Sequence, residues 1–296
     1  MRILHFSDVH LWPPHLPLAL MLPHMREKRF VGWLNLLLSR QRLFNTATHK
    51  VRKLATWMQG QDIDLSICTG DYTALGTSAE LHYARNVIDP LTKTPLGFVT
   101  LPGNHDLYCH DCIDERRFER YFGEFLHSDI LPDRTQKTPW PILKLPSDDV
   151  AIIAINSARP TDSFLNSNGY VSTDELEALD QLLRHDSIQS RFTVIALHYA
   201  PRLASGKPDS RRHGLDNADA LLELCQVIKK GMMIFGHVHH RYRVDIPKLN
   251  IPLFNSGSLT HRRHESFWLY DIEGKALKRA TPGLWNGTEY ALGSIS

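Results

Sequence analysis

The 296-residue sequence predicts an α/β fold built of layers. Short β-rich runs alternate along the chain with amphipathic helical segments, which is the pattern of strands and helices that pack in separate layers. A hydrophobic content of 42% is enough to bury a large core. No internal repeat, low-complexity tract or Pro/Gly-rich linker divides the chain, so we expect a single domain over residues 1–296.

The expected strands are short apolar runs bounded by turn residues. They lie at residues 2–6, 65–69, 97–101, 150–156, 192–197, 232–235, 252–255 and 266–270. Helices at about 46–59 and 217–230 are predicted to end at Gly60 and Gly231. Two further helices are predicted to begin after Thr77 and Ser172, because a glutamate follows each hydroxyl three residues later, which is the spacing of a capping box.

Composition argues against several classes of protein. A formal net charge of +2 is too small for a nucleic-acid footprint over the whole surface. Four cysteines do not make the disulfide framework of a small secreted domain, so we interpret Cys109 and Cys112 as free thiols in a loop. The start MRILHFSD lacks the apolar region of a signal peptide, and no run reaches the roughly 18 apolar residues that span a bilayer. We therefore expect a cytoplasmic protein without a nucleic-acid partner.

Polar residues follow five of the expected strands. These clusters are SDVH (7–10), GD (70–71), GNHD (103–106), His198 and GHVH (236–239). In open α/β sheets ligands collect outside the carboxyl ends of the strands, so the five clusters are expected to meet in one crevice. Their glycines allow tight turns and a close approach of backbone to the site.

The clustered side chains offer carboxylate oxygens, imidazole nitrogens and one amide oxygen, but no thiolate. They are Asp8, His10, Asp71, Asn104, His198, His237 and His239. Such a set suits Mn²⁺, Fe or Zn²⁺ better than Ca²⁺, which prefers oxygen ligands alone. Seven ligands are too many for one tetrahedral ion. Two ions about 3.5–4 Å apart that share one carboxylate can activate a hydroxide and clamp a phosphoryl group.

In this order, the motifs resemble the signature of the calcineurin-like metallophosphoesterases, which is D-x-H, GD, GNH[DE], a lone H and GHxH. The resemblance spans residues 3 to about 260 and implies a four-layer αββα sandwich, in which two mixed β-sheets are flanked by helices. It also implies the pairing of ligands with two divalent metal ions. From the donor set we expect Mn²⁺, with Fe or Zn²⁺ as alternatives. Asp8, His10 and His239 would hold one ion, Asn104, His198 and His237 the other, and Asp71 both.

His105 and Asp106 remain outside the metal set. The resemblance implies that His105 contacts the phosphate and helps the leaving group depart, and we expect Asp106 to orient or charge-stabilise His105. We expect a metal-bridging hydroxide to attack a phosphodiester, such as a cyclic nucleotide. The alternative is a pyrophosphohydrolase that cleaves a lipid-linked nucleotide, such as UDP-2,3-diacylglucosamine, at the membrane surface. Weaker alternatives are a phosphomonoesterase or protein phosphatase, and a non-catalytic metal-binding scaffold.

Residues 11 to about 53 form an insertion between the first two motifs. Between residues 26 and 53, eight Lys or Arg residues stand against one acid and are interleaved with apolar and aromatic residues. Two interpretations remain open: peripheral contact of residues 26–53 with an anionic membrane or a lipid tail, or helices that pack on the sandwich with their basic residues in solvent. A C-terminal extension at about 272–296 is expected to cap the sandwich edge. The sequence does not specify the oligomeric state.

Overall fold

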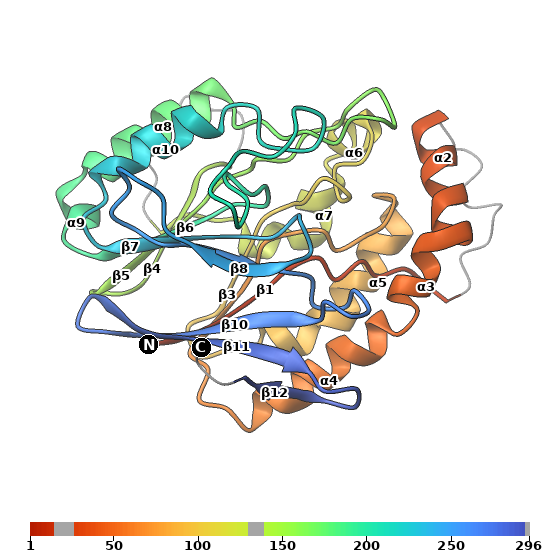
Figure 1. The fold of residues 1–296 in the computed structure, drawn as a ribbon, viewed down its shortest axis with the longest axis horizontal. Helices are drawn as coiled ribbons and strands as arrows, with labels where there is room; N and C mark the ends of the chain where they lie inside the picture. Colours follow the sequence, from red (N-terminus) through yellow and green to blue (C-terminus); the bar gives the residue numbers. More distant parts are fainter. Residues whose placement is uncertain (15–26, 130–138, 294–296) are drawn as a thin grey trace.

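The computed structural model describes residues 1–14, 27–129 and 139–293. Two mixed six-stranded sheets pack face to face (Figure 1). The first sheet has the order β12 (Tyr290–Leu292), β11 (Ala276–Trp285), β10 (Ser266–Glu273), β1 (Arg2–Phe6), β2 (Leu65–Cys68), β3 (Phe98–Thr100). The second has the order β4 (Ile142–Ser147), β5 (Val150–Ala154), β6 (Phe192–Ala196), β7 (Gly231–Phe235), β9 (Leu253–Ser256), β8 (Arg241–Val244).

Helices cover the outer faces of both sheets. Figure 1 shows α8 (Thr173–Arg184), α9 (Asp186–Gln189) and α10 (Ala218–Leu224) over the second sheet. On the side of the first sheet lie α4 (Ala47–Gln59) and α5 (Ser78–Ile88). The predicted four-layer αββα sandwich is therefore confirmed.

The inner strands run parallel and point their carboxyl ends toward one end of the sandwich. In the first sheet β1, β2 and β3 are parallel neighbours, and in the second β5, β6, β7 and β9 are. β5, β6 and β7 are buried along their whole length, which explains their continuous apolar sequences.

All eight expected strands form, and four further strands were not predicted. These are β4, β8, β11 and β12. Each pairs antiparallel at or near a sheet edge, where part of its surface faces solvent, so its sequence lacks a continuous apolar run. β11 and β12 come from the predicted C-terminal extension and form the edge of the first sheet.

The predicted helix ends were correct in part. Gly60 caps α4, and Thr77 and Glu80 form a complete capping box before α5. The prediction for 217–230 was wrong: α10 ends at Leu224, a short 3₁₀ turn (η5, Cys225–Val227) follows, and Gly231 begins β7. A Cβ at Gly231 would collide with the Thr193 carbonyl of β6, so this glycine serves strand packing rather than a helix end.

The described part of the insertion is helical and packs on the sandwich. It comprises α2 (Glu27–Asn35), a π-helical turn η2 (Leu36–Arg40), α3 (Gln41–Phe44) and the start of α4. Arg26, with the rest of residues 15–26, lies outside the described residues.

Several basic residues of the insertion have partners inside the molecule. Arg29 is fully buried and donates two hydrogen bonds, of 2.8 and 2.9 Å, to the Asp111 carboxylate. Asp111 lies on the short helix α6 (His110–Asp114), which is followed along the chain by α7 (Arg117–Phe122). Lys50 pairs with Glu265 at 2.5 Å. The packing interpretation placed the basic residues in solvent, and for Arg29 and Lys50 this prediction was wrong.

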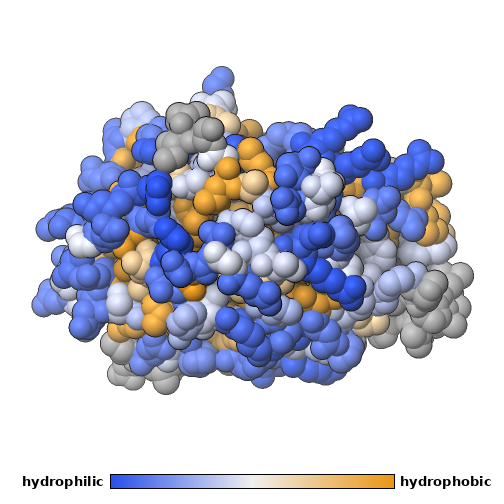
Figure 2. Space-filling view, turned by 90° about the horizontal axis from the view of Figure 1, so that it is seen from below, coloured by the Kyte–Doolittle hydropathy of each residue, from blue (hydrophilic) through white to orange (hydrophobic). Residues whose placement is uncertain are grey.

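The apolar residues of the insertion are partly on the surface. Phe30, Leu37 and Leu38 have exposed fractions of 45%, 48% and 74%. Figure 2 shows a hydrophobic area at the right-hand end of the molecule, the end at which α2 and α3 lie in Figure 1. Among the described residues, no helix is both long enough and apolar enough to cross a membrane.

Candidate metal centre

The five polar clusters meet at one end of the sandwich. Those that follow β1, β2 and β3 come from the first sheet, and those that follow β6 and β7 come from the second. All seven predicted ligands are brought together there. Six of them are buried, and the seventh, His239, is 20% exposed at its side chain.

One group of possible ligands consists of Asp8, His10, Asp71 and His239. The His239 Nε2 atom lies 3.2 Å from Asp8 Oδ1 and 3.1 Å from His10 Nε2. Asp8 Oδ1 is buried and has no hydrogen-bond partner among the described residues. A buried carboxylate oxygen without a donor is costly, and a cation held between these atoms would remove that cost.

A second group lies on the other side of Asp71. The Asn104 Oδ1 atom is 3.1 Å from His198 Nε2 and 3.0 Å from His237 Nδ1. Asp71 Oδ2 is 3.5 Å from His198 Nε2 and 3.7 Å from His10 Nε2 of the first group. One carboxylate oxygen therefore lies between the two groups, as a bridging ligand must.

Three of the histidines are oriented by backbone carbonyls. Nδ1 of His10 lies 3.0 Å from Thr73 O, and Nδ1 of His198 lies 2.7 Å from Thr69 O. Nε2 of His237 lies 2.8 Å from His213 O. Since a carbonyl only accepts, each of these nitrogens carries a proton, and the other ring nitrogen faces the cluster.

Protonation states of the buried groups suit cation binding in part. Burial alone would raise the pKa of Asp71, but His198, His105 and His10 hold it well below its usual range. Burial, followed by the effect of His213, lowers the pKa of His237. Burial also lowers the pKa of His198, but the Asp71 carboxylate outweighs this and raises it to about 9, so His198 would release a proton when it binds a metal.

Backbone strain is concentrated at the same residues. Five of the seven predicted ligands have positive φ angles: Asp8 (55°), His10 (41°), Asp71 (58°), His237 (74°) and His239 (56°). Residues other than glycine rarely adopt this region, and such strain persists only where the surroundings enforce it. The strand ends thus turn sharply enough to direct several side chains toward one point.

Two glycines allow the turns that carry the predicted ligands to approach one another closely. A Cβ at Gly236 would collide with Ser7 and the Asp8 carboxylate, and a Cβ at Gly103 would collide with Asp71. The predicted role of these glycines in close backbone approach is consistent with both positions.

Asp106 has different partners from those expected. Its carboxylate accepts hydrogen bonds of 2.9–3.1 Å from the backbone N–H groups of Asp71, Tyr72, Thr73 and Gly103 and from the Thr73 hydroxyl. No hydrogen bond joins it to the His105 ring among the described residues. Asp106 therefore ties the loop after β2 to the loop after β3. Its expected role toward His105, orientation or charge stabilisation, stays a prediction. Burial and the nearby Asp71 raise its pKa to about 7.

His105 is held by other groups. Its Nδ1 lies 2.6 Å from the Ala74 carbonyl, which leaves Nε2 without that proton, and its ring stacks on Tyr108 with 5.5 Å between centroids. The ring also lies edge-on to His10 at 5.0 Å. His105 therefore borders both the metal ligands and the adjoining cavity.

The family model described as calcineurin-like phosphoesterase matches residues 1–241. The chain belongs to this family. Its members are metal-dependent phosphoric ester hydrolases. The group that contains Asp71, with Asn104, His198 and His237 on its other side, is consistent with a dimetal centre.

Two curated relatives carry the name probable cyclic nucleotide phosphodiesterase. The one from Xenorhabdus bovienii is 24% identical over 191 residues, which cover 64% of each chain. The one from Moraxella catarrhalis is 30% identical over 181 residues, which cover 60% of this chain and 58% of the relative. The chain thus matches less than two thirds of the length of either relative.

Two solved structures are similar in fold. A dimetal phosphatase from Danio rerio has a TM-score of 0.63 and 12% identity, with 99% of this chain and 98% of that chain covered. A purple acid phosphatase from yellow lupin has a TM-score of 0.54 and 11% identity, with 95% of this chain and 53% of that chain covered. At these identities, the similarity establishes the phosphoesterase sandwich alone.

The cavity beside the phosphoesterase motifs has a volume of about 270 Å³ and includes residues that no motif revealed. Lys28 reaches it from α2 and donates hydrogen bonds to Tyr108 O at 2.9 Å and to the Thr161 hydroxyl at 2.7 Å. Arg159 and Phe164 line the same cavity. They are far from the metal motifs in sequence, so only the fold shows that they adjoin the phosphoesterase site.

His213 was also missed. Its ring stacks on His237 with 4.1 Å between centroids, and its Nδ1 lies 2.6 Å from Asp209 Oδ2. Together with His237, these residues form another group that could hold a metal ion. They lie on the irregular connection between β6 and α10, where no strand-end pattern marks them.

Proposed function

We propose that this chain is a binuclear metal-dependent phosphodiesterase. The observation that carries the proposal is the position of Asp71 Oδ2 between His10 Nε2 and His198 Nε2, at 3.7 and 3.5 Å. Asp8 Oδ1, which accepts no hydrogen bond from the described residues, lies 3.2 Å from His239 Nε2 in the same cluster. This arrangement of oxygen and nitrogen donors fits two divalent cations that share one carboxylate.

Within the proposal, the ligands divide as the geometry groups them. Asp8, His10 and His239 would hold one ion, Asn104, His198 and His237 would hold the other, and Asp71 would contact both. Mn²⁺ is the favoured ion, with Fe or Zn²⁺ as alternatives. When bound, such a pair neutralises charge on the phosphoryl oxygens and lowers the pKa of water, so that a nucleophile forms near neutral pH.

The chain's own residues supply proton transfer and positioning. In its imidazolium form, His105 keeps the Nδ1 proton on the Ala74 carbonyl, gives the second proton from Nε2 to the departing oxygen, and is left neutral. Asp106 acts through the backbone: by joining the loops after β2 and β3, it keeps Asp71 and Asn104 in register. Lys28, a cation in the same cavity, pairs with an anionic part of the substrate.

We further propose a phosphodiester of the cyclic-nucleotide type as substrate. The names of the two curated relatives support this choice. The cavity volume of about 270 Å³ lies just below the roughly 300 Å³ at which small-ligand sites begin, which favours a compact substrate.

A second candidate is the cleavage of a lipid-linked pyrophosphate. In its favour, Lys28 and Phe164 line the cavity, and the insertion that contributes Lys28 also exposes Phe30, Leu37 and Leu38. A cation beside the site would pair with a second phosphate, and the apolar side chains would contact an acyl chain or the membrane surface.

The test of the proposed function compares two chromogenic substrates. Mn²⁺-loaded protein should hydrolyse bis-p-nitrophenyl phosphate, a diester, much faster than p-nitrophenyl phosphate, and Asp71→Asn should hydrolyse neither. Turnover of the monoester alone would make the protein a phosphatase. Absence of both activities, with metal bound, would favour a scaffold.

The second candidate is tested separately by sedimentation with anionic vesicles. Binding that Leu38→Ser weakens would support lipid contact through the insertion. Equal recovery in the supernatant with and without vesicles, at low and at high salt, would remove it.

A further inference from the structure

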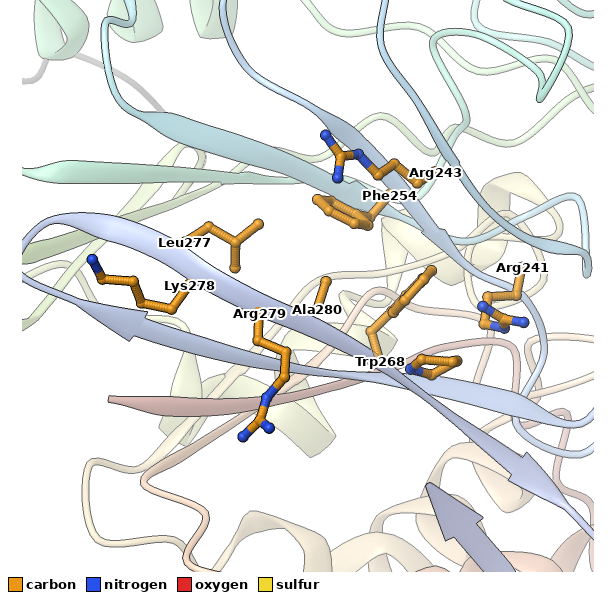
Figure 3. A pocket seen from close by; sticks show the side chains of 9 residues that line it. Arg241, Arg243, Phe254, Trp268, Leu277, Lys278, Arg279 and Ala280 are labelled. Atoms are coloured by element: carbon orange, nitrogen blue, oxygen red, sulfur yellow. The ribbon is translucent and has the colours of Figure 1, made fainter. Parts of the chain in front are cut away.

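A second cavity lies between the two sheets and shares no lining residue with the metal centre. Its volume is about 510 Å³, within the range of small-ligand sites. Figure 3 shows its walls: Arg243 and Phe254 on one side, and Lys278, Arg279 and Ala280 on the other. β8 and β9 provide the first wall, and β11 provides the second, with Trp268 of β10 beside Arg241.

The lining of this cavity is strongly cationic. Arg241, Arg243, Lys278 and Arg279 all line it, and no carboxylate does among the described residues. Two of these cations have acidic partners: Arg279 pairs with Asp271, which Arg2 shares, and Arg243 pairs with the exposed Asp245. Arg241 and Lys278 have no ion pair in the described part of the chain. The cavity therefore offers positive charge that the protein does not neutralise.

Arg241 is the cation of this cavity whose surroundings most clearly indicate an anionic ligand. Its guanidinium lies over the Trp268 ring, 4.8 Å from the centroid, and its Nε is buried without a hydrogen-bond partner among the described residues. Burial lowers its pKa. A half-buried guanidinium without an anion is costly, whereas its planar donors match the oxygens of a phosphate.

Arg243 lies beside Arg241 on the same face of β8. Residues two apart on a strand share a face, and both side chains border the cavity. Arg243 in turn lies over the Phe254 ring at 5.7 Å. The strand thus presents two arginines backed by two aromatic rings, next to the apolar Leu277 and Ala280.

We propose that this cavity binds a nucleoside polyphosphate at a site separate from the metal centre, with the phosphates on Arg241 and Arg243. Lys278 lines the opposite wall, at the far end from Arg241, and adds positive charge there. The base lies against the apolar surface between the two walls, because the aromatic rings beneath the arginines and the Leu277 side chain exclude water there. The site is independent of hydrolysis at the metal centre.

The test is titration calorimetry of the intact protein with ADP. Arg241→Met, which removes the charge and keeps apolar bulk, should raise the Kd at least tenfold, and Lys278→Met, at an exposed position, should raise it severalfold. Arg184→Met is the matched control: Arg184 pairs with Asp180 on α8, outside the cavity, and its loss should leave the Kd unchanged. Asp71→Asn should also leave it unchanged.

Two further probes separate the parts of the ligand. Inorganic pyrophosphate should bind more weakly than ADP, and adenosine should not bind measurably. Equal affinity for pyrophosphate and ADP would overturn recognition of the nucleoside. Wild-type ADP affinity in both Arg241→Met and Lys278→Met would overturn the site itself, as would loss of binding in Asp71→Asn, which would place ADP at the metal centre.

Discussion

The strand-end loops and the insertion both stand out in the sequence, but their residues have different fates in the fold. In the loops, seven predicted ligands converge on one point around Asp71. In the insertion, the basic residues disperse: Arg29 and Lys50 pair inside the molecule, Lys28 borders the metal-centre cavity, and Arg52 faces solvent. A residue's place after a parallel strand determines where it points, whereas a count of charges does not determine what they contact.

The two regions are also held in place differently. The loops combine positive φ angles with the hydrogen bonds that Asp106 accepts from two of them. The insertion is anchored through its buried arginine, because Asp111 pairs with both Arg29 and Arg117. Removing each anchor should therefore affect different properties.

The largest effect is expected from Asp71→Asn. The amide lacks the charge that two cations require, so diester hydrolysis should fall to background and metal content should drop. Arg52→Ala, which removes an exposed charge from the insertion, should retain both. Hydrolysis rates, and metal content by mass spectrometry, compare the two variants. Undiminished activity in Asp71→Asn would contradict the assignment of Asp71 to the metal centre.

His105→Ala should reduce turnover while keeping the metals. Loss of a positioned proton donor costs about 10²–10⁴-fold, and the seven ligands are unchanged. Steady-state kinetics and metal content of the same preparation provide the measurement. Loss of the metals together with activity would show that His105 is part of the ligand shell instead.

Asp111→Ala should destabilise the protein without touching the ligands. The substitution removes the carboxylate that Arg29 and Arg117 share, and these two residues have exposed fractions of 0% and 1%. Removing one partner of a buried ion pair lowers the free energy of unfolding by about 3–5 kcal/mol. Asp162→Ala is the control, because Asp162 is 95% exposed and, within the described part of the chain, forms an ion pair only with the exposed His110. Urea unfolding of both variants gives the difference; equal midpoints would show that the buried pair does not anchor the insertion.

The smallest effect is the acid dependence of the same anchor. Burial opposes ionisation of Asp111, but Arg29 and Arg117 outweigh it and lower the pKa to about 2, against an ordinary value of 3.8. The stabilisation is therefore complete above about pH 4 and is lost as the pH falls toward 2. As the pH falls between these values, the free energy of unfolding should decrease less in Asp111→Asn than in the wild type. Parallel plots of unfolding free energy against pH for the two proteins would contradict the role of Asp111.

The sequence predicts the fold class, the eight strands with apolar sequences and the polar residues that follow five of them. Periodicity and strand ends are local properties, and they sufficed to place Asp8, Asp71 and His198 directly after strands of the sandwich. Strand β8, at a sheet edge, and strand β11, next to one, were not predicted because RYRV and ALKRATPGLW are half-exposed and carry charges. Lys28 and His213 escaped because only the tertiary fold brings them to the site.

Asp106 illustrates a different limit. Its position in GNHD indicated a role at the site, but sequence cannot tell whether a carboxylate faces the neighbouring imidazole or a set of backbone N–H groups. The turns after β2 and β3 present those N–H groups to it, and their number decides the outcome.

The central claim is that Asp71 is shared by two metal ions, and anomalous diffraction from crystals of the Mn²⁺-loaded protein tests it most directly. The account predicts two ions per chain, both in contact with the Asp71 carboxylate, the second also bound by His237 through Nδ1. A single ion, or a second ion held by Asp209 and His213 with Nε2 of His237, would contradict it.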